Sequence, residues 1–258
     1  MSIRGVLVVG KTFNVDGISV DTFKLPEASR RICDEIEGGS SFSVYTINLD
    51  HVVKLRSSAA FRKAYEKARI VLADGFPIVL AGRLQGRDVE RTPGSDLIDP
   101  LCDEAGRRGM SVVLVGATFE ALTAAARELK RRYPALSIGG VYAPPANFDV
   151  QGDGAQECLD FISQSEAQIC LLALGAPKQE LFAERCAREI PSGMSFICIG
   201  AGLDFIAGSQ KRAPKLFQKI GCEWLWRLLN NPRRLARRYA ECLLVFPGVV
   251  FGGLLKRV

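Results

Sequence analysis

The chain has 258 residues, of which 48% are hydrophobic and 24% are charged, so it holds a sizeable core and is not disordered. Its net charge of +6 is unevenly placed. Residues 211–258 carry eleven basic and two acidic residues, whereas residues 1–210 carry 23 basic and 26 acidic ones. The length fits one large α/β domain, or one domain with an appendage.

Cysteine and histidine usage limits the metal chemistry that the chain supports. None of the eight cysteines forms a C-x-x-C pair, and most lie in apolar runs, as buried thiols of a reducing compartment do. The single histidine, His51, excludes most His-based metal sites and argues against a Ser-His-Asp triad. The apolar run at the N-terminus is too short for a secretory signal.

Strand-like and helix-like patterns alternate along the body of the chain. Strands are predicted at 42–47, 69–73, 111–116, 136–142, 168–174 and 194–199, and helices at 49–68, 95–109, 118–133, 155–165 and 178–190. This alternation predicts an α/β, Rossmann-like fold with a mainly parallel sheet and helices on both faces. After about Pro214 the pattern is helical only, so we place a boundary between an α/β domain, 1–210, and a C-terminal appendage, 211–258.

The appendage combines basic residues with an apolar run. Residues 243–255 are uncharged, and Lys256 and Arg257 follow them. Thirteen residues are too few to span a bilayer, which needs about 20, and Pro247 with three glycines argues against one straight helix. The composition fits a segment on an anionic membrane surface and, equally, a helix packed on the core. The basic run 233–238 has no nucleic-acid recognition motif beside it, so no nucleic-acid partner is expected.

Two glycine motifs are only weak signals of nucleotide binding. Residues 5–12 match the phosphate-loop pattern G-x-x-x-x-G-K-[ST], but a strand-like interior and a turn at 14–17 replace the required strand and helix. The pair Gly200 and Gly202 follows a strand without the third glycine of a dinucleotide fingerprint.

Polar residues at the ends of predicted strands are the stronger candidates, because ligands bind outside the carboxyl ends of parallel strands. Asp74 closes a strand before Gly75 and is a candidate general base, although Asp-Gly is also a common turn. Thr46 and Asn48 are placed either to hydrogen-bond a ligand or to cap the helix that follows.

Two further sets of residues suit an anionic ligand. The stretch Gly175-x-Pro-x-Gln-Glu180 places Gln179 and Glu180 at a helix N-terminus, although it also serves simple helix initiation. Arg227, Arg234 and Arg237 follow at i, i+7 and i+10, which is one helical stripe unless Pro232 breaks it. Such a stripe suits a diphosphate, or else it is a solvated face.

Together these residues resemble the WecG/TagA/CpsF glycosyltransferases (glycosyltransferase family 26), from about Ser43 to Tyr239. The ordered set also holds Glu90-Arg91, Gly94, Gly116, Tyr133-Pro134, Gly200-x-Gly with Asp204, Lys211-Arg-Ala-Pro214, Glu223-Trp-Leu-Trp-Arg227 and Pro232-Arg. The chain departs from the family at residues 143–148, where Ala-Pro-Pro-Ala-Asn-Phe replaces a Gly-Tyr-Phe-like element and leaves the nucleotide contacts of that loop unassigned.

The resemblance implies an inverting, metal-independent enzyme of bacterial cell-surface polysaccharide synthesis. It would transfer a sugar from a UDP-sugar to a polyprenyl-diphosphate-linked saccharide, as a peripheral protein at the cytoplasmic face of the inner membrane. Asp74 would be the base, Thr46 and Gln179 would position donor or acceptor, and Asp204 would lie near the nucleotide base. Further substrate contacts are expected from Asn48, Gly75, Arg91, Gly94, Gly116, Gly175 and Glu180. The appendage would close over the site, bring Arg227, Arg234 and Arg237 to the diphosphate, and anchor the enzyme.

The residues themselves agree with this chemistry. No Asp-x-Asp metal motif occurs, so arginines and helix N-termini must meet the charge of the departing UDP, and no cofactor is expected. Two alternatives remain: a nucleotide-binding, NAD(P)-type oxidoreductase and a non-catalytic scaffold on the membrane surface. The identity of the sugar, the acceptor and the polymer stays open, as does assembly into a homo-oligomer.

Overall fold

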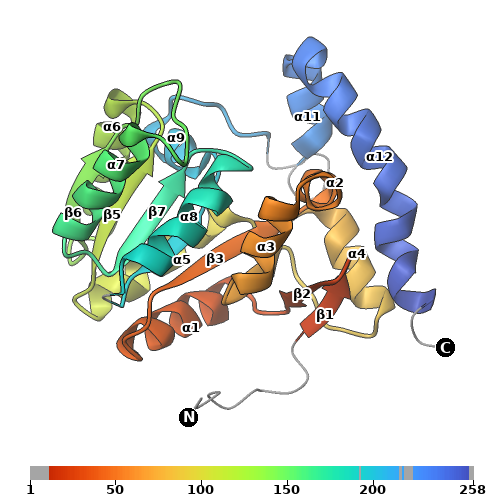
Figure 1. Cartoon of the computed structure of the whole chain (residues 1–258), viewed down its shortest axis with the longest axis horizontal. Coiled ribbons are helices and arrows are strands. Elements are labelled where there is room, and N and C mark those ends of the chain that lie inside the picture. Colours follow the sequence, from red (N-terminus) through yellow and green to blue (C-terminus); the bar gives the residue numbers. More distant parts are fainter. Residues whose placement is uncertain (1–11, 192, 215–216, 218–222, 256–258) are drawn as a thin grey trace.

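The protein is built on one eight-stranded sheet (Figure 1). The structure, a computed structural model, describes residues 12–191, 193–214, 217 and 223–255. The strands are β1 (Thr12–Val15), β2 (Ile18–Asp21), β3 (Phe42–Ile47), β4 (Ile70–Ala73), β5 (Ser111–Gly116), β6 (Ser137–Tyr142), β7 (Ile169–Ala173) and β8 (Ser195–Cys198). Their order is β1-β2-β4-β3-β8-β7-β5-β6, with only β1 and β2 antiparallel, so the predicted mainly parallel sheet is confirmed.

Helices cover both faces of this sheet (Figure 1). They are α1 (Leu25–Glu37), α2 (Leu49–Ser57), α3 (Ala59–Lys67), α4 (Phe76–Leu84), α5 (Gly94–Arg107), α6 (Phe119–Arg132), α7 (Asp153–Gln164), α8 (Lys178–Glu189), α9 (Gly202–Ala207), α11 (Glu223–Asn230) and α12 (Pro232–Leu255). Strand β5 shows why both faces need cover. Val112 and Leu114 enter the core under α1, α5, α6 and α9, whereas Val113 and Val115 enter the core under α2, α3, α4, α7 and α8.

The predicted strands and helices of the body match the structure to within two residues at each end, with one exception. The expected helix over 49–68 is two helices, α2 and α3. Ser58 separates them because its backbone is extended (φ −134°, ψ 110°) and its side chain accepts a hydrogen bond from the Phe61 amide. A serine that caps a new helix in this way ends the preceding one.

The part of the chain before β3 holds elements that the sequence analysis did not predict. Strands β1 and β2 form a hairpin whose two turn residues, Asp16 and Gly17, both have positive φ, as a type I′ turn requires. Helix α1 follows. Residues 5–11 of the phosphate-loop pattern lie outside the described residues, and Thr12 begins a strand where that motif needs a helix.

The C-terminal helix α12 continues through Pro247 and Gly248, so neither residue ends it. Pro247 frees the carbonyl of Leu243, four residues earlier. The Leu243 side chain is 65% exposed and Pro247 is also exposed, so water can reach that carbonyl and the loss of one helical hydrogen bond is tolerated.

Helix α12 lies across α2 and α4 (Figure 1). Leu235, Cys242 and Val249 recur at intervals of seven residues and are buried, whereas Leu244 and Phe251 are exposed. A cavity of about 480 Å³ lies where the end of α12 meets the β1–β2 hairpin, and none of the predicted site residues lines it. Within the part of the chain that the structure describes, we find no helix with the length and hydropathy to cross a membrane.

Candidate active site

The carboxyl ends of five parallel strands place the predicted polar residues in one row. Along the sheet the row runs from Asp74 after β4, through Thr46 at the end of β3, Gly200 after β8 and Gly175 after β7, to Gly116 at the end of β5. Four spacings between neighbouring strands separate its two ends, about 19 Å. The sequence-based rule for strand ends therefore brings these residues to the same edge of the sheet.

The row includes the point at which the sheet changes its winding direction. Helix α6, which follows β5, packs on one face, and α8, which follows β7, packs on the other. Between the neighbouring carboxyl ends of β5 and β7 the connections diverge, which is where ligands bind in open α/β sheets. Gly116 allows these two strand ends to approach closely, because a Cβ atom there would lie 2.5 Å from the Ala173 carbonyl carbon.

Asp74 and Asn48 are in contact at the other end of the row. The Asp74 amide donates to the Ile47 carbonyl at 2.9 Å, which fixes the residue beside β3. Asn48 Nδ2 donates to Asp74 Oδ2 at 3.4 Å, while Asn48 Oδ1 accepts from the His51 amide at 3.1 Å and caps α2. Asn48 thus fills the predicted capping role, and its amide nitrogen is a fixed donor beside the partly exposed Asp74 carboxylate.

Two buried rings hold the backbone of Thr46. Its carbonyl accepts from the Tyr65 hydroxyl and from His51 Nδ1, each at 2.7 Å. Burial lowers the pKa of His51 to about 4, so the ring is neutral at pH 7 and its Nδ1–H is the donor. Thr46 itself is buried at the end of β3 and only 7% exposed.

Gln179 connects the ends of β7 and β8. It is the second residue of α8, and its side chain is almost fully buried. Its Oε1 accepts from the Gly200 amide at 3.1 Å, and its Nε2 donates to Glu180 Oε1 at 2.7 Å. The amide therefore lies between two fixed partners.

Glu180 is fully buried and does not present its carboxyl to solvent. Its Oε2 has no hydrogen-bond partner among the described residues. Burial raises the pKa of Glu180 to about 7, and the hydrogen bond from Gln179 opposes that rise only in part. The titratable groups that act on or respond to this carboxyl are Tyr45, Asp50, Lys54, Tyr65 and Cys198.

Glu180→Gln is expected to remove a pH-dependent loss of stability. The folded carboxyl keeps its proton up to about pH 7, whereas an unfolded carboxyl loses it near its ordinary pKa of 4.5. Between these values the unfolded state binds fewer protons, so the free energy of unfolding falls as the pH rises. The loss reaches about 3 kcal/mol above pH 7.

Urea unfolding of wild type and Glu180→Gln between pH 4.5 and 7.5 measures this loss. The stability of the variant relative to the wild type should increase across that range. Asp21 and His51 also have shifted pKa values, so they too make the stability depend on pH. Their contribution is the same in wild type and variant and cancels when the two stabilities are subtracted. Parallel stability curves would contradict the assignment of the buried proton to Glu180.

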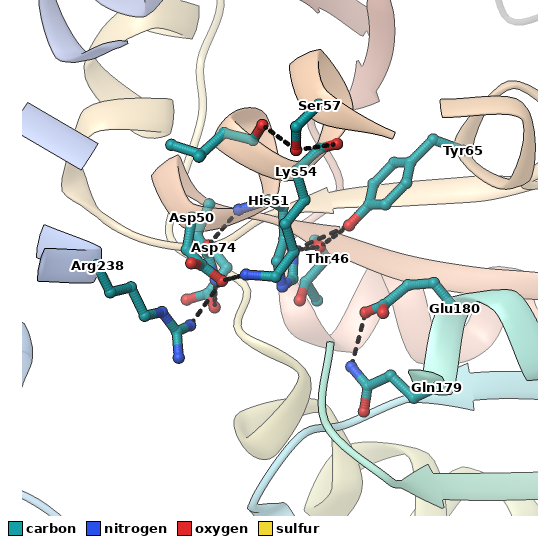
Figure 2. Close-up of polar contacts among 12 residues, drawn as sticks. Thr46, Asp50, His51, Lys54, Ser57, Tyr65, Asp74, Gln179, Glu180 and Arg238 are labelled. Carbon is teal, nitrogen blue, oxygen red and sulfur yellow. Dashed lines mark hydrogen bonds and ion pairs between the residues drawn. The ribbon is translucent and has the colours of Figure 1, made fainter. Parts of the chain in front are cut away.

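An ion cluster joins α12 to the helix that follows Thr46 and Asn48 (Figure 2). Arg238 Nη2 lies 2.7 Å from Asp50 Oδ2, and Lys54 binds the same oxygen. Burial acts to raise the pKa of Asp50, but the hydrogen bond from Lys54 and the charge of Arg238 together lower it below its ordinary value. Asp50 therefore stays ionised and holds a cation of the appendage beside the site.

A second ion cluster joins Glu223 at the start of α11, together with Arg212, to Arg91 just before α5 and Asp96 within α5. Arg91 contacts Glu223 and lies 3.5 Å from Asp96, while Arg212 contacts Asp96 and lies 3.4 Å from Glu223. All four side chains are between 19% and 27% exposed, so the alternating charges are only partly screened. Thr92 donates to the Ala73 carbonyl and places this cluster next to the end of β4.

The remaining predicted residues fall into different surroundings. A Cβ atom on Gly94 would lie 2.7 Å from the Cys198 carbonyl oxygen, so this glycine lets α5 approach β8. Asp204 accepts from Ser209 Oγ at 3.0 Å and Gln210 Nε2 at 3.1 Å. Gly75 is the N-cap residue immediately before α4.

The predicted arginine stripe is interrupted. Helix α11 ends at Asn230 and α12 begins at Pro232, so the break places Arg227 and Arg234 on different helices. The side chains of these two arginines lie outside the described residues. Arg237 is 92% exposed and pairs with Glu241 at 3.0 Å on the same helix.

Sequence reasoning did not identify the partners that connect these residues. Asp50 and Lys54 stand at an i, i+4 spacing, which is a readable signal for an ion pair on a helix. No local pattern indicates that Arg238, 188 residues away from Asp50, completes the cluster.

The described cysteines are all free and buried, as the sequence analysis predicted for such thiols. Cys222 lies outside the described residues. Across residues 12–191, 193–214, 217 and 223–255 there is no cluster of three or more histidine, cysteine or acidic side chains that could hold a metal ion.

A comparison with known families agrees with the motifs and the geometry. The family model described as "Glycosyl transferase WecG/TagA/CpsF family" matches residues 13–257, nearly the whole chain. The match covers β1 to α12 and therefore includes every strand end in the row and both ion clusters. The chain belongs to the WecG/TagA/CpsF family of glycosyltransferases.

Proposed function

We propose that the protein transfers a sugar, with inversion, from a UDP-sugar to a polyprenyl-diphosphate-linked saccharide without a catalytic metal. The observation that carries the proposal is the partly exposed Asp74 carboxylate, held beside Asn48 at one end of the row of strand ends. Family membership favours transfer over the oxidoreductase and scaffold alternatives. The two ion clusters support a role for the appendage next to this chemistry.

Asp74 is the proposed general base. It takes the proton of the acceptor hydroxyl as that oxygen forms a bond to the anomeric carbon of the donor. The bond between the same carbon and the UDP oxygen breaks on the opposite side, so the configuration inverts. The proton ends on Asp74 and the negative charge ends on UDP.

The charge of the departing UDP must be met by fixed donors and cations. Helix α8 follows β7, whose carboxyl end neighbours that of β5, and offers its N-terminal amides, and the hydroxyl of Thr46 and the amide of Gln179 lie at the same edge of the sheet. We assign the diphosphate to arginines of the appendage, with Arg227, Arg234 and Arg237 as the candidates. Asp204, near the end of β8, is the candidate for the nucleotide base.

The acceptor is lipid-linked, and α11 and α12 carry a surface that suits a lipid boundary. Trp224, Leu229, Leu243, Leu244 and Phe251 are between 43% and 82% exposed. Exposed apolar side chains beside basic ones bind an anionic membrane surface by both signals at once. We propose peripheral association with the cytoplasmic face of the bacterial inner membrane.

Full activity in EDTA is expected, because arginines and helix N-termini replace a metal at the diphosphate. Initial rates of transfer with EDTA and with added Mn²⁺ or Mg²⁺ should agree within about twofold, since no step of the proposed mechanism uses a bound metal ion. A strict requirement for either ion would contradict the arginine assignment.

A screen of UDP-sugars with a short polyprenyl-diphosphate sugar acceptor, read by mass spectrometry, tests the proposed function. The expected result is an acceptor that gains the mass of one sugar, with free UDP as the second product. Stabilisation of the fold by UDP in a thermal-shift measurement should accompany it. NAD(P) binding without transfer from any UDP-sugar would overturn the proposal in favour of the oxidoreductase, and vesicle binding alone in favour of the scaffold.

A further inference from the structure

The amide group of Gln179 has only one orientation that satisfies both of its neighbours. The Gly200 amide can only donate, so the atom that faces it must be the oxygen of Gln179. The nitrogen then faces Glu180 Oε1, which accepts from it at 2.7 Å. Exchanging the two amide atoms would place donor against donor at Gly200, so the network fixes the assignment.

Glu180 is held in place independently of this contact. The backbone carbonyl of Glu180 accepts from the Tyr45 hydroxyl at 2.8 Å, and both residues are fully buried. Figure 2 shows the Glu180 and Gln179 side chains meeting on the side of the site opposite Arg238. The residue that carries the acceptor for Gln179 is therefore anchored through its backbone and enclosed on all sides.

Packing does not explain a carboxyl at this position. Oε2 of Glu180 is buried without a hydrogen-bond partner among the described residues, and burying such a group costs free energy. An apolar side chain of similar size would avoid that cost. The raised pKa of the group is a second sign of the same penalty. Buried polar groups that lower stability are typical of functional sites.

We propose that Glu180 is a positioning residue, which holds the Gln179 amide so that its remaining N–H and its remaining oxygen lone pair serve the substrate. The described contacts use one of the two N–H groups and one of the two lone pairs of this amide. Without an acceptor at position 180 the side chain of Gln179 would still bind Gly200 but would rotate about that single bond. This inference rests on the proposed function, because it takes Gln179 to contact donor or acceptor.

A double-mutant cycle tests the proposal on the full-length protein. Glu180→Leu should lower kcat/KM for transfer by about 10- to 100-fold, the range typical of residues that orient a catalytic group. Glu180→Gln keeps an oxygen that can accept from Gln179 and should recover at least about tenfold of that loss. In a Gln179→Ala background, Glu180→Leu should cost less than about twofold further, because its effect passes through Gln179.

Two measurements separate positioning from a merely structural role. Glu180→Leu removes a buried carboxyl, so the unfolding temperature of this variant at pH 7.5 should equal or exceed that of the wild type. If the leucine variant does not fold, Glu180→Ala replaces it in the cycle. Glu184→Leu is the matched control, because Glu184 lies one turn later on α8 and pairs with Lys67 and Arg188 at the surface. It should leave transfer unchanged.

The outcomes distinguish this inference from the proposed function. Equal losses from Glu180→Leu in the wild-type and Gln179→Ala backgrounds would overturn the positioning role and leave the transferase intact. Equal activity of Glu180→Leu and Glu180→Gln would do the same. A wild-type protein that transfers no sugar from any UDP-sugar would overturn the proposed function and this inference together.

Discussion

Asp74→Asn is expected to lower the rate of sugar transfer by about 10²–10⁴-fold, the contribution typical of a general base. The amide of asparagine cannot take the proton of the acceptor hydroxyl. Its oxygen can still accept the hydrogen bond that Asn48 now donates to Asp74, so the end of β4 should keep its geometry. Transfer assays give kcat, and calorimetry with UDP shows whether binding of the nucleotide survives.

Asp88→Asn is the matched control for this variant. This substitution makes the same chemical change, from carboxylate to amide, in the segment between α4 and α5. The side chain of Asp88 is 84% exposed there and pairs with Lys24 at the surface. It should transfer sugar at the wild-type rate. Turnover of Asp74→Asn within about threefold of the wild type would remove Asp74 from the role of base, because a base contributes far more than that.

Local sequence patterns correctly predicted those helices and strands whose local signals favour the same structure as their packing in the fold. Strand β5 is apolar at consecutive positions because both faces of the sheet are covered there, and its predicted bounds match the structure. The helix predicted over 118–133 is α6, and the side chain of Thr118 caps it by accepting from the Ala121 amide. In both cases the residues concerned carry the whole signal within a few positions.

Elements that depend on distant partners were not predictable in this way. Helix α12 continues through Pro247 because its buried stripe, Leu235, Cys242 and Val249, packs on the body, which a local rule about proline does not weigh. The strands of the β1–β2 hairpin have four residues each, and only their turn, with Asp16 and Gly17, is a strong local signal.

The candidate site shows the same division. A topological rule placed Thr46, Asp74 and Gln179 at one edge of the sheet, because parallel strands end together. The burial of Glu180 depends on Tyr45 and on the strands next to α8, and so it could not be read from the Gln-Glu pair. The pairing of Arg238 with Asp50 likewise exists only in the folded chain.

The two ion clusters connect the appendage to both sides of the proposed base. Asp50 lies on the helix that Asn48 caps, and Asn48 is the residue that binds Asp74. Arg91 lies one residue before Thr92, which is bonded to the carbonyl at the end of β4. A movement of α11 and α12 would therefore act on the two segments that flank Asp74.

Ending the chain after residue 210 is expected to leave a folded body that transfers sugar at least about 10²-fold more slowly, the loss typical of removing electrostatic stabilisation at a leaving group. Of the described residues in the two apolar cores, only Val249 comes from beyond that point, so both cores should persist. The shortened chain loses the appendage arginines and also Glu223, the partner of Arg91.

An acceptor with a short, water-soluble lipid makes this result specific to chemistry, because transfer to it does not require membrane binding. Circular dichroism and thermal unfolding of the shortened chain should show the α/β body intact, with a lower unfolding temperature because Asp50 has lost Arg238 while remaining paired with Lys54. Transfer by this body at the full-length rate would show that α11 and α12 serve attachment alone. The diphosphate would then have to be stabilised from within residues 1–210. The N-terminus of α8 and Arg91 are the candidate groups at the strand ends of that body.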